Sequence, residues 1–166
     1  MLITTGNIWE YPSYWKVVPV NIGWKRNRCN VMGRGVAAQA AKIYPDLPAL
    51  LGFYMQRAGA DFTVLRSGFH NLFFFPVKPL VTEAPRLSWK QKASIDLVWK
   101  STCELASLQL HHPVPILIPL VGCGNGQLRP EAVIPLLDSQ LDDNCTLIAW
   151  KITDLPQTYH ERVEPL

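Results

Sequence analysis

The stretch NVMGRGVAAQA, residues 30–40, places Gly33 and Gly35 directly before a run rich in alanine. Alanine is the best helix former, so this run predicts a helix that begins at Gly35 and ends near Tyr44 and Pro45. Glycine leaves backbone N–H groups uncovered, and a helix N-terminus attracts anions. The junction is therefore either a flexible turn before a tightly packed helix or a binding site for a phosphate group.

A second glycine-rich loop, GCGNGQL at residues 122–128, follows the apolar run VPILIPLV at 114–121. A continuous apolar run predicts a strand covered on both faces, and Pro130 marks the start of the next helix. In open α/β sheets, ligands bind beyond the carboxyl ends of the strands, where such loops converge. Two loops of this kind predict a diphosphate held from both sides. The dinucleotide-binding and P-loop signatures are both missing.

The remaining pattern alternates strands with helices and contains no repeat. Further strands are expected at residues 2–5, 16–21, 61–65, 71–77 and 145–150. Asp46 is expected to cap a helix that ends at Gly59, and Ser88 has capping-box spacing and should open a long helix. The fold class is therefore α/β, as a three-layer sandwich in a single domain, residues 1–166.

The composition excludes several classes of protein. Hydrophobic residues make up 48% and charged residues 17% of the 166 residues, which argues against disorder. The net charge is only +3, and no run of Lys or Arg exceeds two, so duplex DNA binding through phosphates alone is not indicated. The four cysteines lack metal-ligand spacing, so no metal and no cofactor are expected. We expect a soluble, cytoplasmic protein, because the sequence shows no secretory signal and no membrane-spanning run.

Four segments in order resemble the landmarks of macro domains, which bind ADP-ribose. They are GNI (6–8), VPVN (18–21), NVMGRGVAAQAAKIYPDL (30–47) and PLVGCGNGQLRPEAVIPLL (119–137). The resemblance covers residues 2–150. It is strongest to the branch that contains DarG-type antitoxins, which remove ADP-ribose from DNA bases, and the terminal ADP-ribose protein glycohydrolases. It implies a macro-domain-like α/β/α sandwich around a central mixed sheet.

The resemblance also implies a ligand site. Asn7 stands where the family usually has the aspartate that contacts the adenine amino group. The loop around Arg34 would wrap the distal ribose and diphosphate, and the second glycine loop would hold the phosphates. The implied ligand-binding residues are Asn7, Ile8, Asn21, Asn30, Met32, Gly33, Arg34, Gly35, Val36, Gly122, Cys123, Gly124, Asn125 and Gly126. We interpret Cys123 as a packing residue and not as a nucleophile.

Lys78 is the catalytic candidate. It ends the apolar run FFFPV. Apart from the family resemblance, this position indicates an edge residue whose charged end reaches solvent. In the branch named above, a lysine at the end of this strand faces the distal ribose and is catalytic. The chain departs from the branch at Gly126, where the protein glycohydrolases place an aspartate. No carboxylate is therefore supplied by the second loop.

A second departure is an apparent insertion, WKRNRC at residues 24–29, which carries Lys25, Arg26 and Arg28. It is either a solvated surface loop or an element beside the ligand cleft that contacts single-stranded nucleic acid or covers the distal ribose.

Three functions remain open from the sequence. The first is an ADP-ribosyl glycohydrolase that uses Lys78 on ADP-ribosylated DNA bases or protein side chains. The second is a module that binds ADP-ribose or a related nucleotide signal without turnover. The third is an ADP-ribose 1''-phosphate phosphatase, for which no phosphatase residue is visible.

Overall fold

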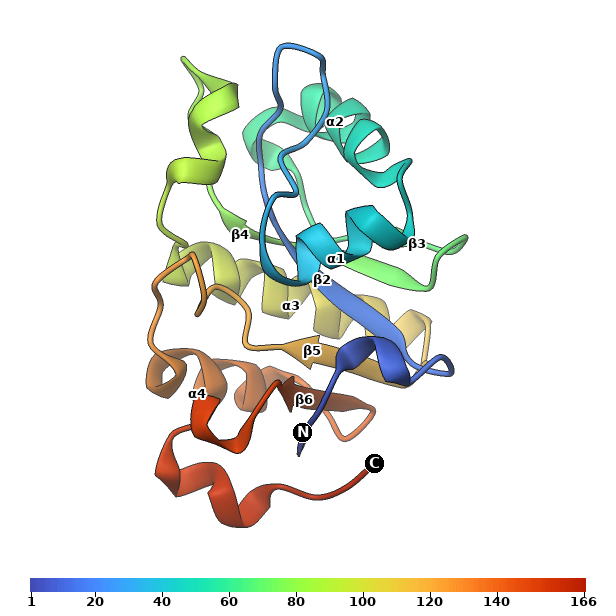
Figure 1. The fold of residues 1–166 in the computed structure, drawn as a ribbon, viewed down its shortest axis with the longest axis vertical. Coiled ribbons are helices and arrows are strands. Elements are labelled where there is room, and N and C mark those ends of the chain that lie inside the picture. Colours follow the sequence, from blue (N-terminus) through green and yellow to red (C-terminus); the bar gives the residue numbers. More distant parts are fainter.

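The computed structural model describes residues 1–166 and contains one six-stranded sheet (Figure 1). The strands are β1 (Leu2–Thr5), β2 (Trp15–Asn21), β3 (Leu65–Ser67), β4 (Leu72–Lys78), β5 (Ile116–Pro119) and β6 (Cys145–Ala149). Their order across the sheet is β1-β6-β5-β2-β4-β3. Every neighbouring pair is parallel except β3 with β4. The sheet is therefore mixed, as expected, and its parallel strands end at one common edge.

Two pairs of helices cover the two faces of the sheet (Figure 1). Helices α1 (Gly35–Ile43) and α2 (Leu47–Ala58) share one apolar core with β2 and β4. Helices α3 (Ile95–His111) and α4 (Pro130–Gln140) share a larger core with the opposite face. This arrangement confirms the three-layer α/β/α sandwich.

The apolar strands follow from burial on both faces. Along β4, Phe73 and Phe75 enter the core under α3, whereas Phe74 enters the core under α1 and α2. Val17 and Val18 divide in the same way along β2. Successive side chains of a strand point to opposite faces, so a strand covered twice must be apolar at every position.

The expected helix start at Ser88 was wrong. Residues Pro85–Lys90 form a 3-10 helix, η3, and α3 begins only at Ile95. Ser94 is the true cap, because its hydroxyl accepts a hydrogen bond from the Leu97 N–H at 3.3 Å. The Ser88 hydroxyl is fully buried and accepts from the Val81 N–H at 3.0 Å instead. Tertiary contact therefore overrode a local capping signal.

Two smaller expectations also changed. The strand expected at 61–65 is replaced by β3, which pairs antiparallel with β4 and shares only Leu65 with the expected strand. Asp46 makes no cap hydrogen bond; its carboxylate lies 3.1 Å from the His70 ring nitrogen. Helix α2 does end at Gly59, which adopts a φ of 58°, as a helix-ending glycine can.

Segments beyond the sheet complete the fold. Short 3-10 helices form at η1 (Ile8–Glu10), η2 (Gly59–Asp61), η4 (Ile152–Asp154) and η5 (Gln157–Arg162). After η5 the chain makes an isolated parallel bridge from Val163 to Ile3. None of the helices combines the length and apolar character needed to cross a lipid bilayer.

The insertion at residues 24–29 packs on α2. The Asn30 N–H donates to the Pro48 carbonyl at 2.8 Å, and the Gln56 side chain donates to the Arg28 carbonyl at 3.2 Å. Gly52 is buried beneath this contact, and a Cβ at this position would overlap the Arg28 carbonyl oxygen. The missing side chain at this position of the continuous helix α2 lets the loop lie directly against it.

We therefore expect Gly52→Ala to destabilise the protein by about 1–3 kcal/mol, the usual cost of overpacking. In an exposed helix the same change would stabilise by up to about 1 kcal/mol. The free energy of unfolding from denaturant titration measures the effect. Gly68→Ala is the control, because a Cβ there meets no atom within 4 Å. A stabilised Gly52→Ala protein would mean that the loop does not press on α2.

Candidate functional site

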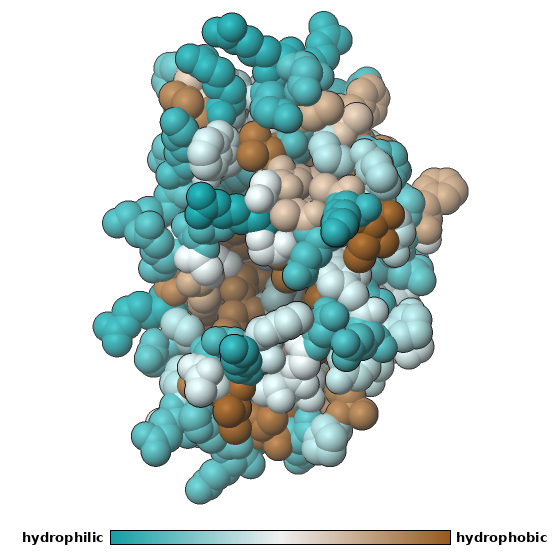
Figure 2. Space-filling view, viewed as in Figure 1, coloured by the Kyte–Doolittle hydropathy of each residue, from teal (hydrophilic) through white to brown (hydrophobic).

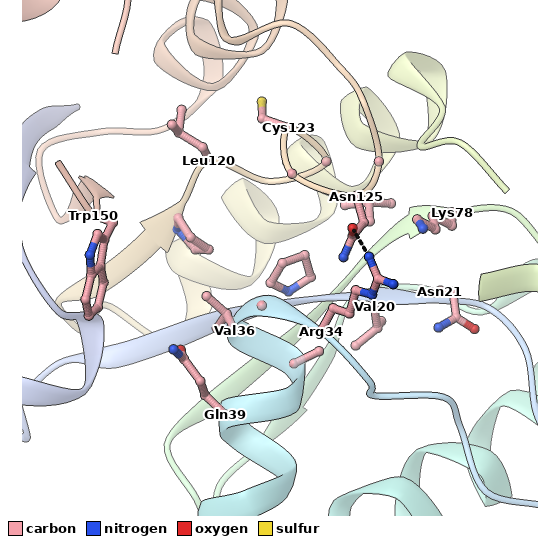
Figure 3. A pocket seen from close by; sticks show the side chains of 18 of the residues that line it. Val20, Asn21, Arg34, Val36, Gln39, Lys78, Leu120, Cys123, Asn125 and Trp150 are labelled. Carbon is pink, nitrogen blue, oxygen red and sulfur yellow. Dashed lines mark hydrogen bonds between the residues drawn. The ribbon is translucent and has the colours of Figure 1, made fainter. Parts of the chain in front are cut away.

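A cavity of about 1030 Å³ opens at the carboxyl ends of β2, β4, β5 and β6. Figure 2 shows it as a hollow on the face of the molecule, with apolar side chains inside. Figure 3 shows the two glycine-rich loops on opposite sides of it. The volume suits a ligand larger than a mononucleotide, since most ligand pockets occupy about 300–1,000 Å³.

The loop between β2 and α1 supplies free backbone donors. Arg34 is the N-cap of α1 in an extended conformation, and Gly35 follows with a φ of 58°. The first bond to a carbonyl four residues back in this helix joins the Ala38 N–H to the Arg34 carbonyl at 3.2 Å. The N–H groups of Gly35, Val36 and Ala37 therefore lack intrahelical acceptors, and all three residues line the cavity.

The loop between β5 and α4 supplies free backbone donors from the other side of the cavity. Its frame is set by the Leu128 N–H, which donates to the Gly122 carbonyl, and the Gln127 N–H, which donates to the Gly124 carbonyl, both at 3.0 Å. No acceptor in the protein takes a hydrogen bond from the N–H of Gly124, Asn125 or Gly126. Rows of unpaired amides of this kind bind anions.

Two positions of this loop are occupied by glycine for different physical reasons. At Gly126 a Cβ would overlap the Gly122 carbonyl and lie 2.6 Å from the Ala93 Cβ, so the fold itself requires glycine. At Gly124 a Cβ would meet no atom within 4 Å. Gly124 lines the cavity, so the absence of a side chain there leaves room for a ligand.

Lys78 ends β4 at the cavity, beside Asn21 of β2, with which it is in register. Its ammonium group donates to the Trp89 carbonyl of η3 at 2.7 Å. Burial lowers the pKa of Lys78, and the positive charge of Arg34 lowers it further. No carboxylate forms an ion pair with it. A lysine in these surroundings loses its proton more readily than an exposed one.

A side-chain contact joins the two loops across the cavity. The Arg34 guanidinium donates to the Asn125 side-chain carbonyl at 3.3 Å, as the dashed line in Figure 3 shows. Both residues are exposed.

The opposite end of the cavity is aromatic and was not foreseen. Trp150 follows β6 with 58% of its surface exposed and lines the cavity, and Figure 3 shows its indole at the side opposite Lys78. The Gln39 side-chain oxygen accepts a hydrogen bond from the Trp9 indole at 2.9 Å, which leaves its amide N–H groups free. Asp154 of η4 is the only carboxylate that lines the cavity. Trp150 could have been found, because it follows a parallel strand at the ligand-binding edge.

The expected ligand-binding residues divide into two groups. Most line the cavity: Ile8, Asn21, Gly33, Arg34, Gly35, Val36, Gly122, Cys123, Gly124, Asn125 and Gly126. Asn7, Asn30 and Met32 do not. The Asn7 side chain caps η1 by accepting from the Trp9 N–H at 3.1 Å. Met32 is buried in the core under α1 and α2, and Asn30 is 1% exposed.

Lys25, Arg26 and Arg28 also lie outside the cavity lining. Of the two interpretations of the insertion, its packing on α2 favours the surface loop. Nucleic-acid contact through these three side chains stays a prediction.

Cys123 lines the cavity but is not suited to attack a substrate. Its thiol contacts the Val121 carbonyl at 3.6 Å, and burial, followed by the negative charge of Glu131, raises its pKa to about 12. The thiolate is the nucleophilic form of cysteine, and it is scarce near neutral pH at that pKa. The side chain packs against the larger core. No group of His, Cys, Asp and Glu side chains is arranged to hold a metal ion.

Comparisons with solved structures define the class of protein. DarTG of Thermosipho africanus in complex with ADP-ribose matches with a TM-score of 0.71 and 17% identity, over 96% of this chain and 44% of that one. The macrodomains of Thermus aquaticus and Mycobacterium tuberculosis DarG match with TM-scores of 0.68 and 0.69 and identities of 22% and 23%. These matches cover 90% and 89% of this chain and 97% of each of theirs.

The chain therefore has the macrodomain fold, as the sequence resemblance implied. Within that fold, DarG macrodomains overlay most of its length, and it spans less than half of the Thermosipho DarTG chain. No protein-family model and no curated protein sequence matches it.

The two glycines predict contrasting variants. Gly124→Val should fold with near-normal stability, because its side chain enters open space and its backbone is unstrained, but the side chain should fill the cavity and block ligand binding. Gly126→Val should lose several kcal/mol of stability from overlap with backbone. Thermal unfolding and calorimetric titration with ADP-ribose measure both effects. Normal binding by a folded Gly124→Val protein would remove this loop from the site.

Proposed function

We propose that the cavity binds ADP-ribose and that the protein hydrolyses ADP-ribosyl linkages. The observation that carries the proposal is the pair of loops with unpaired backbone N–H groups on opposite sides of one cavity. Backbone amides around a glycine-rich loop and a helix N-terminus suit phosphate oxygens. The macrodomain fold supports the same ligand, since one structural neighbour was solved with ADP-ribose.

The two ends of the cavity suit the two ends of this ligand. Trp150, Ile8 and Gln39 provide an apolar and aromatic surface with free amide donors, which favours a nucleobase. Asn21 and Lys78 provide polar groups at the other end, which favour the distal ribose, and Arg34 lies between the two loops. The diphosphate then lies between the loops. In this arrangement the reacting anomeric carbon faces Lys78.

Lys78 can act on that carbon in its neutral form. Its nitrogen would form a bond to the anomeric carbon while the bond to the modified base or side chain breaks. The leaving group departs with the electron pair and takes up a proton, and water then releases ADP-ribose and regenerates the amine. An amine that instead polarises the glycosidic bond would also depend on Lys78. The lowered pKa of Lys78 favours the neutral form.

The non-catalytic alternative has one observation in its favour. The only carboxylate lining the cavity, Asp154, comes from η4 after β6, and two strands separate β6 from β4. No acidic side chain therefore stands beside Lys78 to protonate a leaving group. A protein that binds ADP-ribose without releasing it from any substrate would fit this geometry. No residue lining the cavity supports the phosphatase alternative.

ADP-ribose should bind at a single site, and AMP should bind more weakly because it lacks the second phosphate and the distal ribose. Isothermal titration calorimetry with both ligands measures the difference. Equal affinities would contradict the assignment of the two loops to a diphosphate.

Lys78→Ala should reduce turnover by about a hundredfold or more, the scale of a principal catalytic group, while ADP-ribose binding persists through the loops. Wild-type activity should rise with pH and level off below the ordinary lysine pKa of about 10.4, because the amine must lose its proton. Release of ADP-ribose from modified single-stranded DNA and from modified protein, assayed side by side, measures turnover and identifies the substrate.

Lys92→Ala is the matched control, because Lys92 is an exposed neighbour outside the cavity lining. Lys78→Arg keeps the charge but not a nucleophilic amine. Full activity in Lys78→Arg would rule out amine chemistry. Tight ADP-ribose binding with no release from either substrate would favour the binding module.

A further inference from the structure

We propose that Arg34 is a positioning residue of this site. Held by Asn125 across the cavity, its guanidinium joins the two phosphate-facing loops and keeps a positive charge beside the Lys78 amine. This inference rests on the proposed function for its catalytic meaning, although the contact itself does not.

The geometry of the bridge comes from two distant segments. Arg34 lies on the β2–α1 loop and Asn125 on the β5–α4 loop, 91 residues apart, and their side chains meet at 3.3 Å (Figure 3). An exposed arginine loses rotamer freedom when it is held in one place. Neither side chain has another hydrogen-bond partner in the protein. The contact is therefore the only direct hydrogen bond that ties the two loops to each other.

The charges around Lys78 give Arg34 a specific effect. The other charged side chains lining the cavity are Arg34 from the β2–α1 loop, Lys90 from η3 and Asp154 from η4, and Cys123 is the remaining titratable group. Of these, only Arg34 acts on the Lys78 pKa, which it lowers in addition to the effect of burial. A nearby positive charge disfavours the ammonium form. No carboxylate opposes this effect.

The Arg34 guanidinium therefore affects both the proposed phosphate site and the Lys78 amine. The bridge keeps the guanidinium between the loops, where the diphosphate is proposed to lie, and arginine pairs readily with phosphate oxygens. The same placement raises the neutral fraction of the amine in the free protein. A bound diphosphate would neutralise part of this charge, so the effect should be greatest before the ligand arrives.

The test measures the reactivity of the Lys78 amine in the full chain without any ligand. The rate of Lys78 acetylation by acetic anhydride is followed against pH by mass spectrometry. Arg34→Gln should move the midpoint of this profile upward by about 0.5 pH unit or more, the scale expected for one charge at the edge of a protein. Asn125→Ala should move it in the same direction, because the guanidinium is no longer held.

The double variant tests whether the two residues act as a pair. Arg34→Gln combined with Asn125→Ala should shift the midpoint no further than Arg34→Gln alone. Arg129→Gln is the matched control: it removes an exposed positive charge that follows the same loop but does not line the cavity, and it should leave the midpoint unchanged. An unchanged midpoint in Arg34→Gln, or additive shifts in the double variant, would overturn the proposal.

Calorimetry on the same proteins separates this inference from the proposed function. Arg34→Gln should weaken ADP-ribose binding several-fold, whereas Arg34→Lys should recover part of the affinity and most of the Lys78 reactivity profile. If the wild-type protein does not bind ADP-ribose but the reactivity shifts are intact, the proposed ligand is wrong. The role of Arg34 in setting the protonation state of Lys78 is then still supported.

Discussion

The side-chain amide of Asn30 holds the loop on which the cavity depends. Its nitrogen donates to the Gly23 carbonyl at 2.7 Å and to the Asn21 carbonyl at 3.0 Å, while the Asn21 amide donates to the Val31 carbonyl at 2.8 Å. These bonds fasten the start of α1 to the end of β2, although an insertion separates them in sequence. Asn30 is 1% exposed, and loss of its amide would leave buried carbonyls without donors at a cost of about 1–3 kcal/mol each.

The anion-binding character of the site follows from this constraint. Because the loop is returned to the sheet edge, the free N–H groups of Val36 and Ala37 face the same cavity as those of Gly124 and Asn125. Neither loop encloses a ligand alone. The parallel strands align the two loops, and the helices that follow them fix their direction. Asn30 thus supports the site from beneath without lining it.

The polar end of the cavity holds a lysine with a lowered pKa but no acidic side chain beside it. Lys78 is held by a carbonyl, partly buried and beside a cation, and each of these last two lowers its pKa. Such a lysine is a better nucleophile than an exposed one, yet no acidic side chain lines the cavity beside it. Gly126 of the second glycine loop is required by close backbone packing. An acidic residue placed there by substitution would therefore disturb the loop.

The sequence by itself determined the three layers, the two glycine loops and the lysine at the end of β4. These features depend on local signals: apolar runs that must be covered, glycines beside helix starts, and a cation closing an apolar strand. It did not determine which residues meet. Asn7 caps η1 and the insertion rests on α2 through Gly52, and no local sequence signal indicated either contact. The contact of Lys78 with Trp89 crosses from β4 to η3, the bridge from Arg34 to Asn125 spans 91 residues, and the aromatic end at Trp150 follows the last strand. Such contacts arise only when the sheet brings its strand ends together, because side-chain reach is a few ångströms and sequence spacing carries no information about it.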